Sequence, residues 1–438
     1  MEILGNICTG ITTVLSVLMI YQVVYAVIGF FCKAKKYPEA KTMHSYGIVI
    51  AARNERLVIG NLLDSIAAQN YDMSLVRVFV VADNCTDDTA EICRAKGAIV
   101  YERNDPTRAR KGYAMEYLFS FIERDYGVES LEGYLVFDAD NLLHPDYLKE
   151  INKAFDTGVD AAVGYRNTKN FSTNLISAGY GIHFCRSSAL MHRPRALLNV
   201  PTHIAGTGYV LRSHLLRDGW HFTSLTEDTE FTLTSVADGL HIAFCEEAEF
   251  FDEQPYSMGV MVRQRLRWSK GRLFCFLSCA WGLLRGCFVK PRGGKVGRFG
   301  CYDMFFYAFP KGLFSALVSL IYAVASVAVF GFSTEPQALA DGALGLARSL
   351  LISYLGFVLI GAVTVIRERK HIHCSTLRLI WYTVAFPWFD LLGLPIAIAS
   401  LFMRVKWKPI RHDKAVRIDE LAPVSRSEKD EETIEETV

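Results

Sequence analysis

Long apolar stretches constrain the fold of this 438-residue chain more than any other feature. The first stretch, residues 3–32, contains no charged side chain. It lacks a basic region before it and a small-residue cleavage site after it, so it predicts a retained anchor and not a signal peptide. Each stretch is about as long as a membrane-crossing helix. Three later stretches carry only Lys311 and Asp390 as charges, and they span residues 304–332, 349–366 and 379–403.

Basic residues predict how these stretches are oriented. Lys33, Lys35 and Lys36 follow the first one directly, which places them in the cytoplasm and the N-terminus outside. Basic residues also follow the last stretch and favour a cytosolic C-terminus. However, if each of the three later stretches crossed the membrane fully, starting from the cytosol, the C-terminus would lie outside. Pro387 and Pro395 interrupt that stretch, which predicts a re-entrant hairpin or two short tilted pieces. We therefore expect a multi-pass protein of the cell membrane.

Composition excludes some partners. The net charge of +1 gives no electrostatic basis for binding nucleic acid. The 11 cysteines are scattered without a Cys-x-x-Cys pair, so neither a zinc site nor a disulfide framework is predicted. The tail after Leu421 is rich in Ser, Asp and Glu, and we expect it to be disordered.

Strand and helix patterns alternate between the first and second apolar stretches. Continuous apolar runs at 46–52, 76–82 and 134–137 are typical of buried strands, and the periodicity at 58–66 and 109–124 is typical of helices. This alternation predicts an α/β fold with a mostly parallel sheet and helices on both faces. Ligands of such sheets bind beyond the carboxyl ends of the strands.

Acidic residues stand at two of those strand ends. Asp83 ends one predicted strand, while Asp138 and Asp140 lie two positions apart at the end of another. Residues two apart in a strand point to the same side, so these two carboxylates can share a ligand. Hard oxygen ligands suit Mg²⁺ or Mn²⁺, with positions left for water or a diphosphate. For the pair taken alone, an Asp-rich turn is the alternative.

A second acidic cluster, Thr226-Glu227-Asp228, precedes a helical pattern. Ser224 and Glu227 have the spacing of a capping box, so these acids can simply cap the helix and favour its dipole. A carboxylate near a helix N-terminus is also held ionised, and an ionised Asp228 can accept a proton. The residues by themselves leave both interpretations open.

Further on, Gln264, Arg267 and Trp268 are predicted to share one face of a helix. An arginine offers planar donors to phosphate, and a tryptophan offers a flat apolar face to a sugar ring. The alternative is an amphipathic helix on the membrane surface, and the two interpretations are compatible.

These motifs, in the order in which they occur along the chain, resemble those of the membrane-bound family-2 glycosyltransferases. This group includes cellulose, hyaluronan and poly-N-acetylglucosamine synthases. The four motifs are Asp83, Asp138-Ala139-Asp140, Thr226-Glu227-Asp228 and Gln264-Arg265-Leu266-Arg267-Trp268. The resemblance covers residues 45–290. It implies a cytosolic GT-A domain between membrane helices. It also implies an inverting transfer from a UDP-sugar, UDP-glucose or UDP-N-acetylglucosamine, to a saccharide acceptor, with Mg²⁺ or Mn²⁺ as cofactor.

The resemblance also implies a role for each residue. The expected donor-binding residues are Asp83, Lys111, Asp138 and Arg267. The expected metal ligands are Asp138 and Asp140. The expected catalytic residues are Asp228, as the general base, and its neighbour Glu227. The expected acceptor-binding residues are Gln264 and Trp268, with the loop at 203–209 on the acceptor side.

A short segment after the last apolar stretch occupies the place of a C-terminal motif of hyaluronan synthases. Its Trp407, Arg411 and His412 are a possible lid that folds back onto the diphosphate, and plain basic residues near anionic lipid are the alternative. The predicted domains are an anchor at 1–36, the GT-A domain at 37–257, interfacial helices at 258–300, a membrane region at 301–404, and a basic segment with an acidic tail at 405–438.

Two transferase functions follow from the sequence. The first, which the several apolar stretches and the Gln264-x-x-Arg267-Trp268 motif favour, is processive synthesis of a β-linked polysaccharide, exported through the membrane helices of the same chain. The second is non-processive transfer of one sugar to a lipid or short acceptor. A third possibility is a membrane protein that only senses nucleotides. Such a protein would not need a base opposite its metal site, so Asp228 argues against this possibility.

Overall fold

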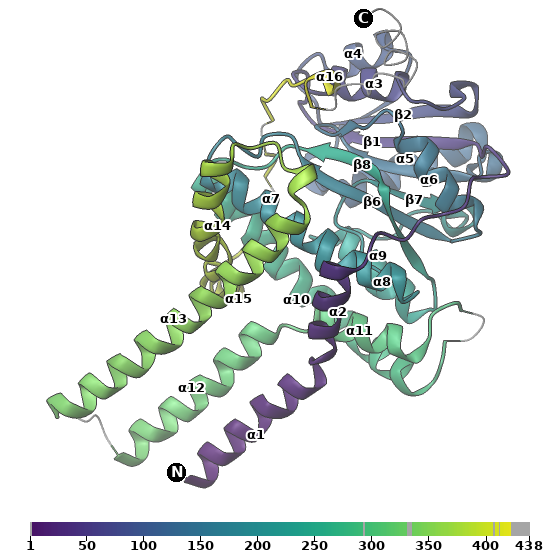
Figure 1. The fold of residues 1–438 in the computed structure, drawn as a ribbon. Coiled ribbons are helices and arrows are strands. Elements are labelled where there is room, and N and C mark those ends of the chain that lie inside the picture. Colours follow the sequence, from purple (N-terminus) through teal and green to yellow (C-terminus); the bar gives the residue numbers. More distant parts are fainter. Residues whose placement is uncertain (1, 292–293, 331–334, 406–407, 411, 422–438) are drawn as a thin grey trace, which may run out of the picture.

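The computed structural model describes residues 2–291, 294–330, 335–405, 408–410 and 412–421. The chain has an α/β part and a set of long helices that project from one side of it (Figure 1). The N-terminus lies at the far end of these helices, whereas the last described residues return to the α/β part.

The α/β part is built on a sheet that has eight strands within the described residues, in the order β3-β2-β1-β4-β7-β6-β8-β5. Strands β1 to β4 run parallel, β7 runs antiparallel between β4 and β6, and β6 runs parallel to β8. The predicted mostly parallel α/β sheet is therefore confirmed. The strands are β1 (Tyr46–Ala52), β2 (Val76–Asp83), β3 (Ile99–Arg103), β4 (Gly133–Asp138), β5 (Leu142–Leu143), β6 (Ala161–Thr168), β7 (Tyr209–Arg212) and β8 (Ile242–Asp252).

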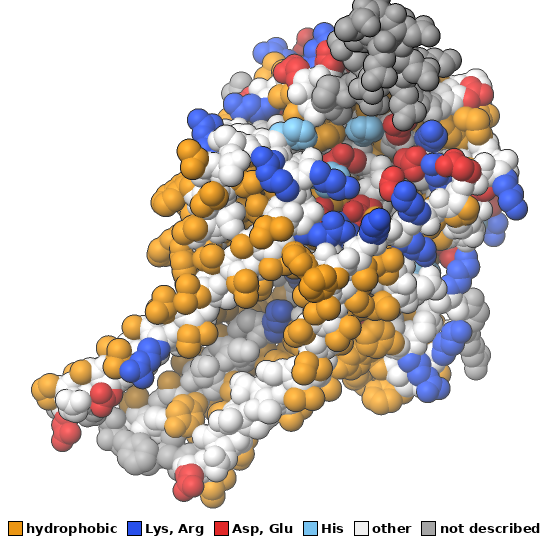
Figure 2. Space-filling model, in the orientation of Figure 1, with side chains coloured by type: hydrophobic (Ala, Val, Ile, Leu, Met, Phe, Trp, Pro, Cys, Tyr) orange, Lys and Arg blue, Asp and Glu red, His pale blue; other side chains and the backbone are white. Residues whose placement is uncertain are grey.

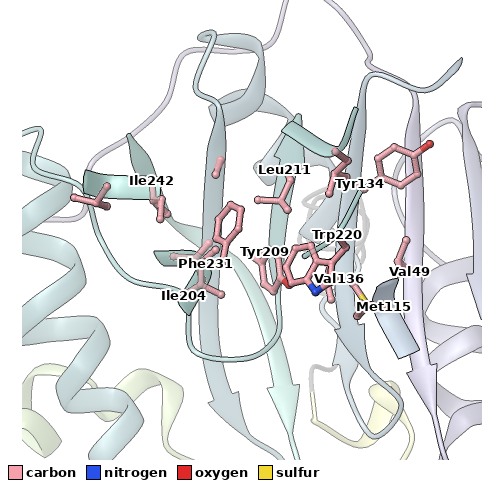
Figure 3. Close-up of a cluster of buried hydrophobic side chains, with 14 of the residues drawn as sticks. Val49, Met115, Tyr134, Val136, Ile204, Tyr209, Leu211, Trp220, Phe231 and Ile242 are labelled. Carbon is pink, nitrogen blue, oxygen red and sulfur yellow. The ribbon is translucent and has the colours of Figure 1, made fainter. Parts of the chain in front are cut away.

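Helices cover both faces of this sheet. The helices of the α/β part are α3 (Ile59–Ala67), α4 (Thr89–Ala95), α5 (Lys111–Tyr126), α6 (Tyr147–Asp156), α7 (Leu175–Ser187), α8 (Arg193–Leu197) and α9 (Glu227–Ala237). The apolar sides of α3 and α6 pack on one face, and those of α5 and α9 pack on the other. On this second face, Val136 and Tyr209 of the sheet lie with Met115 of α5 and Phe231 of α9 (Figure 3).

Most of the remaining helices lie between the α/β part and the far end of the molecule, whereas the last of them lies on the α/β part near α3 (Figure 1). They are α1 (Glu2–Leu18), α2 (Tyr21–Phe31), α10 (Met258–Phe288), α11 (Arg298–Ala308), α12 (Lys311–Phe330), α13 (Pro336–Arg367), α14 (Thr376–Leu391), α15 (Gly393–Phe402) and the short α16 (Ile418–Leu421). The long helix α10 packs against α9, α11 and α15, and α14 packs against α7 and α13. These contacts join the projecting helices to the sheet through α10 and α7.

Four helical segments of the described chain are long and apolar enough to cross a membrane by length and composition. They are Glu2–Phe31, Lys311–Ala328, Leu339–Arg367 and Thr376–Phe402. Hydrophobic side chains cover the outer surface of the projecting helices (Figure 2). The first stretch is helical over Glu2–Phe31, as expected, with a turn at Met19 and Ile20 that divides it into α1 and α2. The last stretch also breaks, at Leu392, into α14 and α15, which lie near the α/β end of α13 (Figure 1).

A buried ion cluster ties the two parts together. The guanidinium of Arg193 on α8 lies 2.6 Å from Glu246 of β8 and 2.6 Å from Glu368 at the end of α13. It also donates to the carbonyl of Gly29 on α2 at 2.9 Å. All three charged side chains are buried. A buried charge is tolerated only when it is paired, so these contacts hold the helices in a defined position on the sheet.

Candidate active site

The acids predicted at the strand ends meet in one cavity. In the sheet, Ala52 of β1 lies opposite Ala82, and Ala51 lies opposite Asp138. Asp83 and Asp138 therefore leave the same edge of the sheet on either side of β1. Asp83, Asp138 and Asp140 all line a cavity at this edge.

Asp83 is fixed by its neighbours at the end of β2. Its carboxylate lies 2.5 Å from the guanidinium of Arg103, and both side chains are buried. The side-chain amide of Asn84 donates to the same carboxylate at 2.8 Å. The backbone of Asn84 lies in the left-handed region, with a φ of 54°. A charge-assisted pair of this kind holds the carboxylate in one orientation.

Lys111, the first residue of α5, joins the strand end to the loop at 203–209. Its ammonium pairs with Asp138 and donates to the carbonyl of Gly206 at 2.7 Å. Burial opposes the charge of Lys111, but the negative charges of Asp138 and Glu227 outweigh burial and raise its pKa. Lys111 therefore stays protonated in the cavity.

Asp140 lies among several other charged groups. It is 3% exposed, and one of its carboxylate oxygens accepts a hydrogen bond from the backbone N–H of Glu253 at 3.0 Å. Burial raises the pKa of nearby Asp252 to about 6. The charge of Arg166 lowers this pKa, whereas the charge of Asp140 raises it further. A set of carboxylate oxygens with this excess of negative charge can hold a hard divalent cation.

Glu227 and Asp228 form the first turn of α9 and line the same cavity. The capping-box interpretation is wrong: the N-cap residue is Thr226, no side chain caps it, and the backbone N–H of Ser224 donates to Glu230 instead of Glu227. Neither acid of the pair is therefore used by a capping box. Burial raises the pKa of Asp228, and burial with the charge of Asp228 raises the pKa of Glu227 to about 7.

The predicted α10 residues also line the cavity, on the side of α9. Arg267 donates to the carbonyl of Leu225 at 2.8 Å, which directs it toward the loop before Glu227. Trp268 meets Tyr180 edge to face with 5.9 Å between ring centroids. The side-chain oxygen of Gln264 is buried and has no hydrogen-bond partner within the described residues. An unpaired buried acceptor is costly, so this oxygen is a place for a ligand hydroxyl.

The predicted lid falls partly outside the described residues, because Trp407 and Arg411 are not among them. His412 is described, and its Nδ1 lies 3.0 Å from Glu55 while its Nε2 lies 4.0 Å from Asp140. Burial opposes its charge, but Asp140 and Glu55 raise its pKa to about 10. The flanking chain is anchored too, since the backbone N–H groups of Asp413 and Lys414 each donate to Glu253 at 3.2 Å.

Sequence reasoning missed several residues of the cavity. Those that it did not assign to the site are Glu55, Arg166, His183, Asp252, Glu253, Arg272 and Tyr307. Glu55 was visible in principle, because it follows the end of β1 as Asp83 ends β2. The others lie on β6, α7, α10, α11 and at or just beyond the end of β8, and only tertiary packing brings them together. No short sequence motif predicts them.

The fold and this cavity together define an enzyme of the GT-A-like class. The chain belongs to the glycosyltransferases of family 2, since the model described as "Glycosyltransferase like family 2" matches residues 44–271. This match spans every predicted motif except the C-terminal segment. The finer resemblance to cellulose and hyaluronan synthases stays a prediction.

The relatives found by comparison have low sequence identity to this chain, but the matches extend over most of it. A probable glycosyltransferase, YdaM of Bacillus subtilis, is 24% identical over 85% of this chain and 86% of its own. A beta-monoglucosyldiacylglycerol synthase of Nostoc is 24% identical over 63% of this chain and 58% of its own. Among solved structures, the mannosyltransferase PcManGT of Pyrobaculum calidifontis, in complex with GDP-Man and Mn²⁺, matches with a TM-score of 0.54. It is 18% identical and the match covers 84% of this chain and 98% of that one, a likeness in fold.

Proposed function

We propose that this protein is an inverting, metal-dependent glycosyltransferase that moves a sugar from UDP-glucose or UDP-N-acetylglucosamine to an acceptor at the membrane. One observation carries the proposal: a single cavity is lined by the strand-end acids, by Asp228 and by Gln264 and Trp268. A diphosphate site, a base and an acceptor wall are the parts that such a transfer needs.

Asp138 and Asp140 would hold Mg²⁺ or Mn²⁺. Their carboxylate oxygens suit a hard cation, and the local charge favours one: burial raises the pKa of Glu55, and Asp140 and Asp138 add to that shift although His412 lowers it. The bound cation would neutralise charge that develops on the departing diphosphate. Lys111 and Arg267 would contribute positive charge beside it, and Asp83 would contact the nucleoside.

Asp228 would act as the general base. The acceptor hydroxyl oxygen forms a bond to the anomeric carbon, its proton passes to Asp228, and the bond from that carbon to the diphosphate breaks on the opposite face. This single displacement inverts the configuration and releases UDP. Glu227 would stand beside the base in the same field of Lys111 and Arg267.

The helix arrangement favours a single sugar addition to a lipid or short acceptor over processive synthesis with export. The cavity lining includes Tyr307 of α11 but, within the described residues, no residue of α1, α12 or α13. These three helices are also barely packed, since at most 11% of each span is buried. One chain therefore offers no enclosed passage for a polymer in its described part.

For the membrane arrangement we infer three crossings, by α1 with α2, by α12 and by α13, with α14 and α15 on the cytosolic side. This arrangement keeps the basic residues after the last apolar stretch in the cytosol. Labelling intact cells with an impermeant maleimide tests it in a cysteine-free background. Gly342→Cys should react and His373→Cys should not; the reverse pattern would refute the assignment.

We retain the lid as part of this proposal, because His412 lines the cavity together with Lys408 and Ile410. The variant Arg411→Ala should lower turnover and weaken UDP-sugar binding. Full turnover with unchanged affinity would remove the lid from the mechanism.

A donor screen tests the function as a whole. Purified protein in lipid vesicles is incubated with UDP-[¹⁴C]glucose or UDP-[¹⁴C]N-acetylglucosamine, with Mn²⁺ and Mg²⁺ compared, and the labelled product is sized. A product with one added sugar supports the proposal as stated. A high polymer would restore processive synthesis, and the absence of transfer from every UDP-sugar and metal would reject the donor class.

A further inference from the structure

The cavity continues toward the membrane helices beyond the predicted acceptor residues. Gln264, Trp268 and Arg272 follow one another at intervals of four on α10, and all three line the cavity. Residues at this interval share one face of a helix, and each turn advances about 6 Å. Arg272 therefore extends the acceptor wall by one turn.

An aromatic stack fixes Arg272 in this place. Its guanidinium lies over the ring of Tyr307, 5.4 Å from the centroid, and that ring stacks on His203 with a centroid distance of 4.1 Å. His203 in turn stacks on His192 at 4.3 Å. A cation held over an aromatic face keeps its donors free at the edge of the guanidinium.

The charge of Arg272 is only partly balanced by the protein, because Arg272 acts on the carboxylate of Asp228 without pairing with it. Within the described part of the chain its side chain makes neither an ion pair nor a hydrogen bond, in contrast to Arg195, which lies 2.6 Å from Asp303. Lys311 also has no ion pair there, and the charges that act on it are those of Arg186 and Arg272. Arg272 thus lines the cavity as an unpaired cation, and Lys311 lies outside the cavity lining but within the electrostatic reach of Arg272.

The surroundings add more positive than negative charge. Arg186 pairs with Asp390, and Arg265 donates to the carbonyl of Phe389. Burial, followed by the charge of Arg186, lowers the pKa of His183 in this region to about 3, so its imidazole is neutral. We call Arg186, Arg265, Arg272 and Lys311 the membrane-side basic cluster. Among its four cations only Arg186 is paired with a carboxylate, that of Asp390, while Arg272 acts on Asp228 from a distance, so the cluster favours an anion.

The position of the cluster indicates where that anion comes from. Lys311 is the first residue of α12, whose apolar span runs from Lys311 to Ala328. A basic residue at the start of such a span lies at the depth of the lipid headgroups. Lipid phosphate is the anion found at that depth.

We propose that the acceptor is a phosphate-bearing lipid whose headgroup carries a free hydroxyl, with the phosphate held by Arg272 and Lys311 and the hydroxyl placed at Asp228. In this arrangement the sugar or polyol of the headgroup would lie along Trp268, one turn of α10 before Arg272. Transfer joins the hydroxyl oxygen to the anomeric carbon, gives its proton to Asp228 and releases UDP. This inference rests on the proposed function and names its acceptor class.

The test compares lipids that share a hydroxyl but differ in phosphate. Protein in phosphatidylcholine vesicles receives a labelled UDP-sugar and equal mole fractions of phosphatidylglycerol, phosphatidylinositol, a polyprenyl-diphosphate sugar or diacylglycerol. We expect the label in one of the phosphate lipids, eluting as an acidic lipid on anion exchange. Label in diacylglycerol or in a water-soluble product, or donor hydrolysis without acidic labelled lipid, overturns the inference while the transferase function stands.

Variants separate acceptor binding from other effects. Arg272→Gln should raise the acceptor KM about tenfold, the loss of one charge-assisted contact, while the donor Kd stays unchanged. Arg272→Lys should recover part of that loss. The control is Arg285→Gln, an exposed arginine of the same helix outside the cavity, which should behave as wild type. Because Arg272 also lowers the pKa of Asp228, rates are compared at a pH where the base is fully ionised. An unchanged acceptor KM in Arg272→Gln would overturn the inference, whereas loss of all UDP-sugar binding by wild type would overturn the proposed function.

Discussion

The ammonium of Lys111 lies 2.7 Å from the carbonyl oxygen of Gly206 and also pairs with Asp138. One side chain therefore joins the end of β4, which presents Asp138, to the loop in front of Asp228. Gly206 has a φ of 89°, and a Cβ placed on it would lie 3.8 Å from the Asp228 carboxylate. Lys111 thus ties the end of β4 to the loop that lies beside Asp228.

Replacing that cation should weaken donor binding. In Lys111→Gln the charge beside the diphosphate is lost, and we expect the donor KM to rise about tenfold with a smaller change in the acceptor KM. Initial-rate kinetics over both substrates measure this. Lys149→Gln, an exposed lysine of α6, is the matched control and should change neither constant. A Lys111→Gln enzyme with wild-type donor KM would show that Lys111 is only structural.

The pH dependence follows from the environment of the base. Burial raises the pKa of Asp228, and the charge of Arg267 lowers it. A base works in its ionised form, so kcat/KM should fall as the pH drops through this raised pKa, at a higher pH than for an ordinary aspartate. Arg267→Gln removes a charge that favours ionisation, and the acidic limb of its profile should move to still higher pH. A limb that moves to lower pH in this variant would contradict the assignment.

The metal concentration that transfer requires should depend on Asp140. Chelation with EDTA is expected to abolish transfer, and Mn²⁺ or Mg²⁺ should restore it. Asp140→Asn should require a metal concentration about 10- to 100-fold higher for half-maximal activity, as for other losses of ligand quality. The control is Asp146→Asn, which lies outside the cavity. Full activity of the EDTA-treated wild-type enzyme would exclude the metal.

The buried ion cluster should be the most sensitive point for stability. In Arg193→Leu, Glu246 and Glu368 lose their partner while still buried, which costs about 3–5 kcal/mol. Thermal unfolding in detergent should show a clear fall in Tm, and Glu246→Gln combined with Arg193→Leu should recover part of it. By comparison, Arg217→Leu breaks an exposed pair with Glu129 and should cost below about 1 kcal/mol. Equal shifts in the two single variants would show that burial is irrelevant.

The meeting of the strand-end acids at one edge of the sheet could be predicted from the sequence for a physical reason. A strand that ends in an acid has the same local signature wherever it occurs, and parallel strands bring such ends together, as they do for Asp83 and Asp138. The helix that carries Gln264 and Trp268 was likewise visible from its spacing. Its start at Met258 coincides with the predicted boundary of the interfacial helices.

Features that depend on tertiary packing could not be predicted. The spacing of Ser224 and Glu227 fits a capping box, yet the helix begins at Glu227, because Gly271 of α10 packs against Thr226 and the backbone of Ser224 binds Glu230. Arg272 looked like any basic residue of an amphipathic helix. Its role emerges only with Tyr307 and His203, which lie on segments distant in sequence.

In the proposed mechanism Asp228 removes the proton of the acceptor during transfer. The decisive measurement is turnover and UDP-sugar affinity of Asp228→Asn, compared with Asp238→Asn at the exposed end of the same helix. Asp228→Asn should lose at least about 100-fold in turnover and keep its affinity for the donor, while Asp238→Asn should retain both. Wild-type turnover in Asp228→Asn would contradict this mechanism.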